Sequence, residues 1–304
     1  MKKIESHKVP QLKEPQRLSD YLPGKFLSIS SRKGIKKAIE KKLVHVNGSA
    51  GRTSKYINGG EEIILYESKV ELRKPIIDIP MDIIYEDEHM AIINKPPGLV
   101  VSGNKLRTVE NALPNLLQKS NEIDGLLRPH PAHRLDFPTS GLLIIGKTRS
   151  SVTALNLLFE KRQISKTYLA VTIGDMKATE GRIENSIRKK SAVTEYKCLY
   201  SVDSKKFEKL NLVELSPVTG RRHQLRIHMH ENGNSLLGDN TYFIEGKKSI
   251  GNGLYLHAYS LSFQHPISKS DINVTAPLPP KFTKIFGKEN TIAFTVNKES
   301  EEEE

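Results

Sequence analysis

A polar loop runs directly into an apolar strand at residues 133–145, where the sequence reads HRLDFPTSGLLII. Aspartate, proline, serine and glycine in the first nine residues favour turns, and the last four residues are aliphatic. Catalytic residues are often held on such a loop, because the adjoining strand gives it a rigid base. Asp136 in this loop is either an ordinary turn residue or a reactive carboxylate, and its local sequence favours the turn residue.

A second polar stretch, residues 219–228, reads TGRRHQLRIH and alternates polar and apolar residues toward its end. The alternation predicts a strand over 225–228, with Gln224, Arg226 and His228 on one face. On that face, Arg226 is either a surface charge or the partner of a carboxylate in a charge-assisted pair.

Short strand-like segments dominate the chain around these two stretches. They are predicted at residues 83–85, 90–93, 142–145, 167–173, 196–200, 210–215 and 254–263. Helical periodicity occurs at 109–118 and 151–163. Strands outnumber helices and do not alternate with them regularly, which predicts an α+β fold.

The first 80 residues have a different character. Residues 1–14 lack periodicity and predict a flexible arm, and residues 69–80, with Pro75 and Pro80, predict a linker. Between them, two helices and two short strands predict a compact unit at residues 15–68. Its second helix, at residues 32–42, begins after Ser30 or Ser31, either of which can cap it.

The exposed face of that second helix is strongly basic. It carries Arg32, Lys33, Lys36, Lys37, Lys41 and Lys42 against only Glu40. Such a face is either solvated or in contact with phosphates, and six basic residues in eleven favour phosphates.

The net charge of the chain points to polyanions as partners. There are 47 basic and 35 acidic side chains, but Glu299 and Glu301 to Glu304 lie in an acidic segment, residues 291–304, that is expected to be solvated. Without these five acids, 47 basic residues face 30 acidic ones, a net charge of +17. This excess favours nucleic acid first and an anionic membrane second.

Composition excludes several other classes. The hydrophobic fraction of 37% is enough for a folded core, yet no apolar run approaches the roughly 20 residues of a membrane helix. The N-terminal residues lack the apolar region of a secretory signal. The single cysteine, Cys198, excludes an internal disulfide and a cysteine-based zinc site. Cytoplasm is the expected compartment.

Taken together, these motifs resemble the RluA-type family of RNA pseudouridine synthases. The family's H-R-L-D-x-x-T-S-G-L-L motif matches residues 133–143, and G-R-x-H-Q-[IL]-R-x-H matches residues 220–228. K-x-Y-x-A matches residues 166–170, residues 85–87 and 94–101 match the family's entry motif, and residues 256–258 match its last strand. The resemblance implies a mixed, mainly antiparallel sheet flanked by helices over a catalytic domain at residues 81–290. The unit at residues 15–68 is similar to the S4 RNA-binding module that many family members carry.

The resemblance also implies a reaction and its residues. A uridine in RNA would be converted to pseudouridine without any metal or cofactor. Asp136 matches the catalytic aspartate, which acts either as nucleophile at C1′ or on the 2′ proton. Arg226 matches the arginine that pairs with it, and Tyr168 matches the aromatic that packs against the base and acts on the C5 proton. Arg134 matches a residue that fills the space left by the flipped base.

The partner expected on these grounds is structured RNA, bound in part through Arg32, Lys33, Lys36 and Lys37. Ribosomal RNA is the first expectation and transfer RNA the second, with no membrane partner. The oligomeric state is left open, with a monomer as the default. Phe137-Pro138 and Ser102-Gly103 depart from the family pattern, which puts the identity of the RNA in doubt.

Two other functions compete with this one. A metal-dependent hydrolase could use Asp136 with His223, His228 and His230, but the predicted strand would place His223 and His228 on opposite faces. A catalytically silent RNA-binding protein would keep the basic helix and lose Asp136, Tyr168 or Arg226, and all three residues are present.

Overall fold

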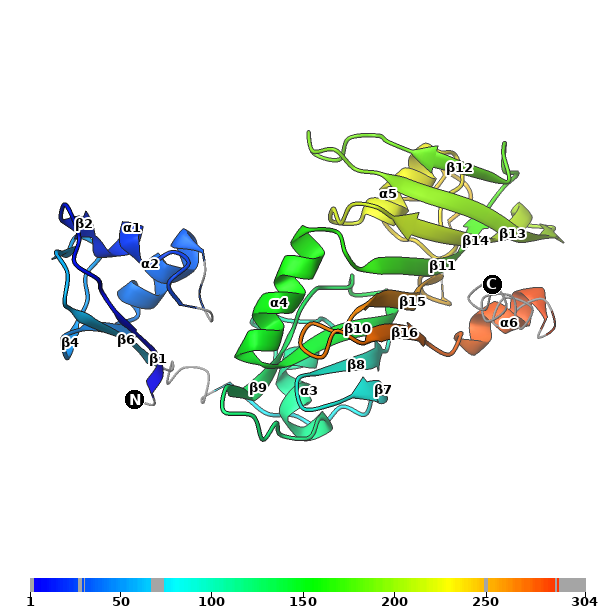
Figure 1. Ribbon diagram of the computed structural model, residues 1–304. Helices are drawn as coiled ribbons and strands as arrows, with labels where there is room; N and C mark the ends of the chain where they lie inside the picture. The colour runs from blue at the N-terminus through cyan, green and yellow to red at the C-terminus, as the bar shows by residue number, and fades with distance from the viewer. Residues whose placement is uncertain are drawn as a thin grey trace.

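The computed structural model describes residues 3–26, 29, 31–66, 74–248, 251–287 and 289. The described chain forms a small N-terminal module, residues 3–66, and a larger domain from residue 74 onward (Figure 1). Residues 69–73 of the predicted linker at residues 69–80, and all of the acidic segment at residues 291–304, lie outside the described residues. No helix within the described ranges is long and apolar enough to cross a membrane.

The N-terminal module is built on a four-stranded sheet with the order β1-β6-β3-β4. Its elements are β1 (Lys3–Lys8), β2 (Gln16–Arg17), α1 (Leu18–Tyr21), α2 (Arg32–Glu40), β3 (Val44–Val46), β4 (Ser49–Ala50), β5 (Tyr56–Ile57) and β6 (Glu62–Tyr66). Strands β2 and β5 pair separately. The module has an apolar core of its own, in which Leu18, Ile35 and Ile63 are completely buried.

Helix α2 begins where its sequence predicts. The Ser31 side chain accepts a hydrogen bond from the Gly34 amide at 3.1 Å, so Ser31 is the N-cap. Ile35, Ala38 and Ile39 are buried against the core, and the basic residues lie on the opposite, exposed face.

The prediction of a flexible arm at residues 1–14 was wrong. Strand β1 pairs with β6 from Lys3 to Lys8, and the Val9 amide donates to the Glu61 carbonyl at 2.9 Å. The strand lacks an apolar pattern because it is an edge strand whose side chains are mostly exposed or half-buried. Main-chain hydrogen bonds hold it in place, and these leave no periodicity in the sequence.

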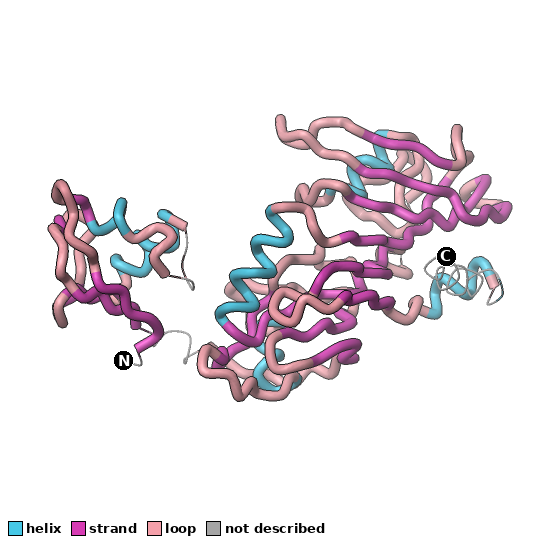
Figure 2. The backbone as a smooth tube through the Cα atoms, in the orientation of Figure 1, coloured by secondary structure: helices cyan, strands magenta, loops and turns pink. Residues whose placement is uncertain are grey.

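The larger domain contains a ten-stranded sheet, which confirms the α+β prediction (Figure 2). Its elements are β7 (Asp82–Glu86), β8 (Met90–Lys95), α3 (Val109–Leu116), β9 (Gly125–Pro131), β10 (Ser140–Thr148), α4 (Arg149–Glu160), β11 (Ser165–Ile173), β12 (Glu180–Ile183), β13 (Thr194–Ser204), β14 (Glu208–Pro217), α5 (Gln224–Glu231), β15 (Leu256–Gln264), β16 (Asp271–Thr275) and α6 (Pro280–Phe286).

Strand order divides this sheet into two half-sheets. The order is β12-β13-β14-β11-β15-β10-β8-β7, with β16 added to β15 and β9 to β10. The pairs within each half, β12 to β15 and β10 to β7, are antiparallel. The halves meet where β10 lies parallel to β15, and only two residue pairs are in register there, Ser140 with His257 and Gly141 with Ala258.

Strand β10 is buried at all nine positions because both of its faces are covered. Leu143 and Ile145 pack with residues of α3, whereas Leu142 and Ile144 pack with Leu155 of α4. A strand buried on both faces reads as a continuous apolar run, as residues 142–145 do.

Gly141 makes the junction between the half-sheets possible. A Cβ atom on Gly141 would lie 2.2 Å from the Ala258 carbonyl oxygen, closer than real contacts allow, and its φ of +110° disfavours any other residue. The glycine that follows the polar loop therefore brings β10 against β15.

The strand predicted at residues 225–228 is a helix in the structure. Leu225, His228 and Met229 of α5 are buried at spacings of three and four, which fits a helix as well as the short alternation fitted a strand. Four alternating residues are too few to distinguish the two periods. The expected sharing of one strand face by Gln224, Arg226 and His228 was therefore wrong.

Candidate active site

Asp136 lies on the loop between β9 and β10, beside the junction of the half-sheets. The buried side chain of Leu135 anchors the loop in the core, and the Thr139 amide donates to the Asp136 carbonyl at 3.1 Å. The Gly98 amide donates to the Phe137 carbonyl at 2.8 Å. These contacts hold the Asp136 carboxylate at the edge of a cavity, with 17% of its side chain exposed.

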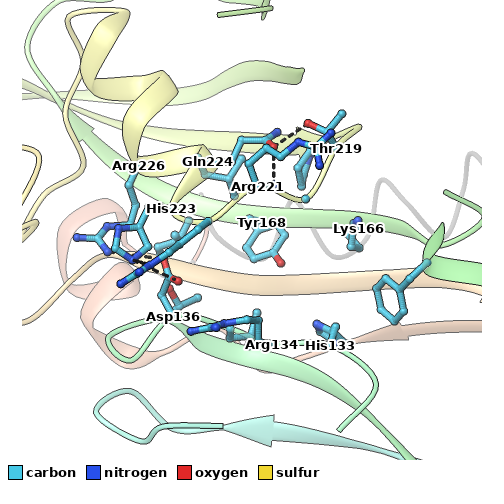
Figure 3. A pocket seen from close by; sticks show the side chains of 18 of the residues that line it. His133, Arg134, Asp136, Lys166, Tyr168, Thr219, Arg221, His223, Gln224 and Arg226 are labelled. Atoms are coloured by element: carbon cyan, nitrogen blue, oxygen red, sulfur yellow. Dashed lines mark hydrogen bonds and ion pairs between the residues drawn. The ribbon is translucent and has the colours of Figure 1, made fainter. Parts of the chain in front are cut away.

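Arg226 reaches this carboxylate from α5, on the other half-sheet. Its Nη1 lies 3.6 Å from Asp136 Oδ2 (Figure 3). The arginine is also paired with Asp239, through Nε to Oδ2 at 2.6 Å and Nη2 to Oδ1 at 2.7 Å. The guanidinium is therefore fixed by Asp239 and presents its remaining nitrogen to Asp136.

Asp239 is a residue that the sequence analysis missed. Its side chain is fully buried and also accepts hydrogen bonds from the Thr241 and Tyr242 amides. Burial acts to raise the pKa of Asp239, but the hydrogen bonds from Arg226 and the two amides outweigh it and hold that pKa below its usual range. The only local signal is an acid after Leu236-Leu237-Gly238, which any turn could show.

His223 is a second contact of Asp136. It is the N-cap of α5 and adopts a left-handed backbone, with φ of 58°, which is uncommon for a residue other than glycine. Its Nε2 lies 3.7 Å from Asp136 Oδ1, and its Nδ1 is 3.1 Å from the Tyr242 hydroxyl. Burial lowers the pKa of His223, although the charge of Asp136 opposes this shift.

Tyr168 comes from β11 and lies between Asp136 and Lys166 in the view of Figure 3. Burial, followed by the negative charge of Asp136, raises the pKa of the Tyr168 phenol well above its usual range. Burial also lowers the pKa of Lys166. The phenol is therefore protonated at neutral pH, and its ring forms an apolar wall with a hydroxyl at one end.

The cavity measures about 350 Å³ and is lined by the three residues predicted to be catalytic, Asp136, Tyr168 and Arg226. This volume falls within the range of about 300–1,000 Å³ that small-molecule sites occupy. Arg134, predicted to fill the space of a flipped base, is exposed at the same cavity.

Several polar residues of the two motifs have structural roles. Gln224 accepts from Thr219 Oγ1 and the Arg221 amide, and donates to the Val193 carbonyl and Thr194 Oγ1. It therefore ties the start of α5 to the start of β13. His133 Nε2 accepts from the Ile144 amide at 3.0 Å. Burial, followed by the charge of Lys166, lowers the pKa of His133 to about 3, so it is neutral.

The histidines considered as metal ligands already have hydrogen-bond partners within the protein. Both ring nitrogens of His228 have partners, Thr194 Oγ1 at 2.9 Å and the Asn185 carbonyl at 3.0 Å. His230 Nδ1 contacts Ser235 Oγ at 2.8 Å. Within the part of the chain that the structure describes, no three His, Cys, Asp or Glu side chains are arranged to hold a metal ion.

The residues predicted to contact RNA lie on the N-terminal module. Arg32 forms an ion pair with Asp20 at 2.6 Å, whereas Lys33, Lys36 and Lys37 are exposed on the outer face of α2. Arg32 is therefore partly committed to its own module, whereas the three lysines are exposed to a polyanion.

Comparisons with known proteins identify the family to which the chain is similar. The family model described as RNA pseudouridylate synthase matches residues 89–231. An uncharacterized RNA pseudouridine synthase of Aquifex aeolicus is 34% identical over 301 residues, covering 90% of this chain and 93% of the relative. The ribosomal large subunit pseudouridine synthase C of Rickettsia felis is 32% identical over 307 residues, covering 89% and 95%.

A solved structure shows the same fold. Human RNA Pseudouridylate Synthase Domain Containing 4 matches with a TM-score of 0.55 and 25% identity, over 66% of this chain and 90% of the human chain.

Proposed function

The chain belongs to the RluA-type family of RNA pseudouridine synthases and isomerises uridine in RNA, and we propose that Asp136, Tyr168 and Arg226 carry out this reaction on ribosomal RNA. The observation that carries the assignment of the site is the Asp136 carboxylate, held between Arg226 at 3.6 Å and His223 at 3.7 Å at the edge of the Tyr168 cavity.

The reaction exchanges one bond of the uracil for another. The N1–C1′ bond breaks, the detached base turns within the cavity, and C5 bonds to C1′. C5 loses its proton to solvent while N1 gains one, so the atoms balance and no electrons are lost or gained. The protein has to extract the nucleotide from its stack, act on the ribose and retain the base while it turns.

Asp136 is the group that acts on the ribose in this proposal. It either forms a bond to C1′ as the base departs or removes the 2′ proton. The carboxylate must face C1′ in the first route and the C2′ hydrogen in the second, in a fixed orientation, and Arg226, itself held by Asp239, provides that orientation.

In this proposal Tyr168 has a more limited role than the family resemblance implies. A phenol that is protonated at neutral pH is not a standing base for the C5 proton. We therefore assign Tyr168 to packing against the uracil and to a hydrogen bond with it. Arg134, at the mouth, fills the space that the flipped base leaves.

The N-terminal module is proposed to bind RNA through Lys33, Lys36 and Lys37, as its similarity to the S4 module suggests. A match over 90% of the chain to the Aquifex relative must include part of this module, because residues 81–304 make up less than three-quarters of the chain. The ribosomal substrate, and with it a cytoplasmic location, is inferred from the name of the Rickettsia relative.

The test of this proposal is pseudouridine mapping of total RNA from cells with and without the gene, by carbodiimide-dependent stops of reverse transcription. We expect loss of one or a few sites in ribosomal RNA, restored by the purified protein but not by Asp136→Ala. Asp271→Asn, which changes an exposed aspartate on β16, is the control and should restore them. Loss of a site in transfer RNA would instead identify transfer RNA as the substrate. Restoration by Asp136→Ala would remove Asp136 from the mechanism.

A further inference from the structure

A second cavity, of about 660 Å³, adjoins the one that contains Tyr168. Six residues line both cavities, so they form a shared wall: Arg134, Leu135, Asp136, Arg222, His223 and Arg226. Tyr168 lines only the smaller cavity. If the target uracil packs against Tyr168, the larger cavity is open to another part of the RNA.

One rim of the larger cavity is formed by an exposed aromatic side chain. Phe137 follows Asp136 directly and is 55% exposed, although the loop backbone is fixed by the hydrogen bond from the Gly98 amide to the Phe137 carbonyl. An aromatic ring on a rigid backbone is a stacking surface for a nucleobase.

The walls of the larger cavity are basic. Arg134 and Arg222 are exposed there, and Lys281 reaches it from α6. Lys281 Nζ donates to the Leu254 carbonyl at 2.6 Å, which uses one of its three protons. Two acids lie on the walls. Asp239 is already paired with Arg226, and Asp136, which lines both cavities, also lies beside Arg226. The positive charge left over suits a phosphate.

RNA connectivity decides which nucleotide occupies this cavity. The ribose of the flipped uridine must lie at Asp136, which belongs to the shared wall. The phosphates on either side of that ribose are covalently joined to it, so a neighbouring nucleotide is within reach of the far side of the wall.

We propose that the larger cavity binds the nucleotide covalently adjacent to the target uridine, with its base stacked on Phe137 and its phosphate facing Arg222 and Lys281. This inference rests on the proposed function and names a specificity-determining residue of the same site. Because its ring lines this cavity, Phe137 would give this enzyme a preference for a neighbouring base.

The test uses an RNA hairpin that contains a uridine identified by the mapping experiment and labelled with tritium at C5. Isomerisation releases the tritium to water, which gives kcat and KM. The hairpin is made with its natural neighbours, and with an abasic residue 5′ or 3′ of the uridine. The proteins are the wild type, Phe137→Ala, Phe137→Tyr and, as control, Leu157→Ala, which removes another exposed apolar side chain (47% exposed) outside both cavities.

We expect Phe137→Ala to lower kcat/KM on the natural hairpin about tenfold, from the loss of one base–aromatic stack. Phe137→Tyr keeps the ring and should retain the wild-type value, as should Leu157→Ala. One of the two abasic hairpins should lower kcat/KM of the wild type by a similar factor. The same hairpin should lower kcat/KM of Phe137→Ala only slightly, because that variant already lacks the stack.

Two results overturn the inference separately from the proposed function. If Phe137→Ala releases tritium at the wild-type rate, no base stacks on Phe137. The same conclusion follows if the reductions in kcat/KM caused by the abasic residue and by Phe137→Ala simply multiply when the two are combined. Absence of release by the wild type from every RNA would overturn the proposed function, and this inference with it.

Discussion

Positive charge is arranged differently in the two parts of the chain. On α2, Lys33, Lys36 and Lys37 are exposed on a helix face. In the catalytic domain, Arg226 is buried, with 6% of its side chain exposed, and is paired through two nitrogens with Asp239. The exposed lysines can attract a polyanion from many directions and are screened by salt. The buried arginine does not attract a polyanion from many directions and is little screened by salt. It instead fixes the geometry of its pairs with carboxylates.

The difference separates affinity from chemistry. Residues of α2 should affect how much RNA is bound and at what salt concentration. Residues around Asp136 should affect the rate after binding. Substitutions in the two regions should therefore change different kinetic parameters, and the following experiments test this separation.

The largest effect is expected at Asp136. Asp136→Asn should lower tritium release at saturating RNA by at least about 1000-fold, because removal of a residue that reacts with substrate costs most of kcat. RNA affinity and the urea unfolding curve should match those of Asp271→Asn. A variant that retained a tenth of the wild-type rate would show that the ribose chemistry is carried out elsewhere.

A smaller effect is expected at Asp239. Asp239→Ala should lower the free energy of unfolding by about 3–5 kcal/mol, because it leaves the Arg226 charge buried without its main partner. It should also lower kcat more than it raises KM, since Arg226 would no longer be held against Asp136.

An exposed ion pair supplies the control for Asp239. Glu208→Gln breaks the contact with Lys247, in which 65% of the Glu208 side chain is exposed. Urea denaturation should show a change of about 1 kcal/mol or less for it. Equal costs for the two variants would mean that the buried pair does not hold the site together.

Acid should lower the free energy of unfolding of the catalytic domain by a measurable amount. Burial, followed by the charge of Lys281, lowers the pKa of His257 to about 4, whereas in the unfolded chain it is near 6.5. Between these values the unfolded chain binds the proton and the folded chain does not, so stability falls as the pH drops from about 6.5 toward 4.

The expected loss from His257 is about 2 kcal/mol between pH 7 and pH 5, read from urea unfolding at each pH. His257→Asn should make that part of the profile less steep, whatever its effect at pH 7, and the remaining slope includes the contribution of His133, whose pKa is also lowered. A variant with the same slope as the wild type would place the proton uptake at other residues.

The smallest effect is expected on α2. Replacement of Lys33, Lys36 and Lys37 by glutamine should weaken RNA binding about tenfold and reduce the slope of log affinity against log salt by about 0.7 for each lost phosphate contact. The rate at saturating RNA should not change. Lys161, Lys205 and Lys206, also exposed, provide a matched triple replacement. An equal change in both triples would mean that α2 contributes only general charge.

Much of the fold could be predicted from periodicity and turn residues. The strand at residues 142–145 and the helix that starts at Arg32 were both present in the pattern, because apolar spacing reports directly on burial. The edge strand β1 and the helix α5 were not. Backbone pairing at an edge leaves no pattern, and a four-residue alternation fits a helix and a strand equally well.

The site could be predicted only in part, and for a related reason. Asp136, Tyr168 and Arg226 stand out because they belong to motifs. Asp239 does not, since its importance comes from a bidentate contact between segments that are 13 residues apart in the chain. His223 was considered only as a metal ligand, because nothing in the sequence indicates that α5 begins there in a left-handed conformation.

The junction at Gly141 also has a mechanical consequence. Asp136 precedes β10 on one half-sheet, whereas Tyr168 and Arg226 belong to the other, and only two residue pairs join β10 to β15. A rotation of one half against the other would change the 3.6 Å separation of Asp136 and Arg226. It is resisted by the apolar cluster in which Leu142 and Ile144 of β10 pack with Leu261 and Phe263 of β15. Torsional stiffness at this junction therefore sets how constant the separation of Asp136 and Arg226 is, and a bound RNA that touches both halves would act as a brace across it.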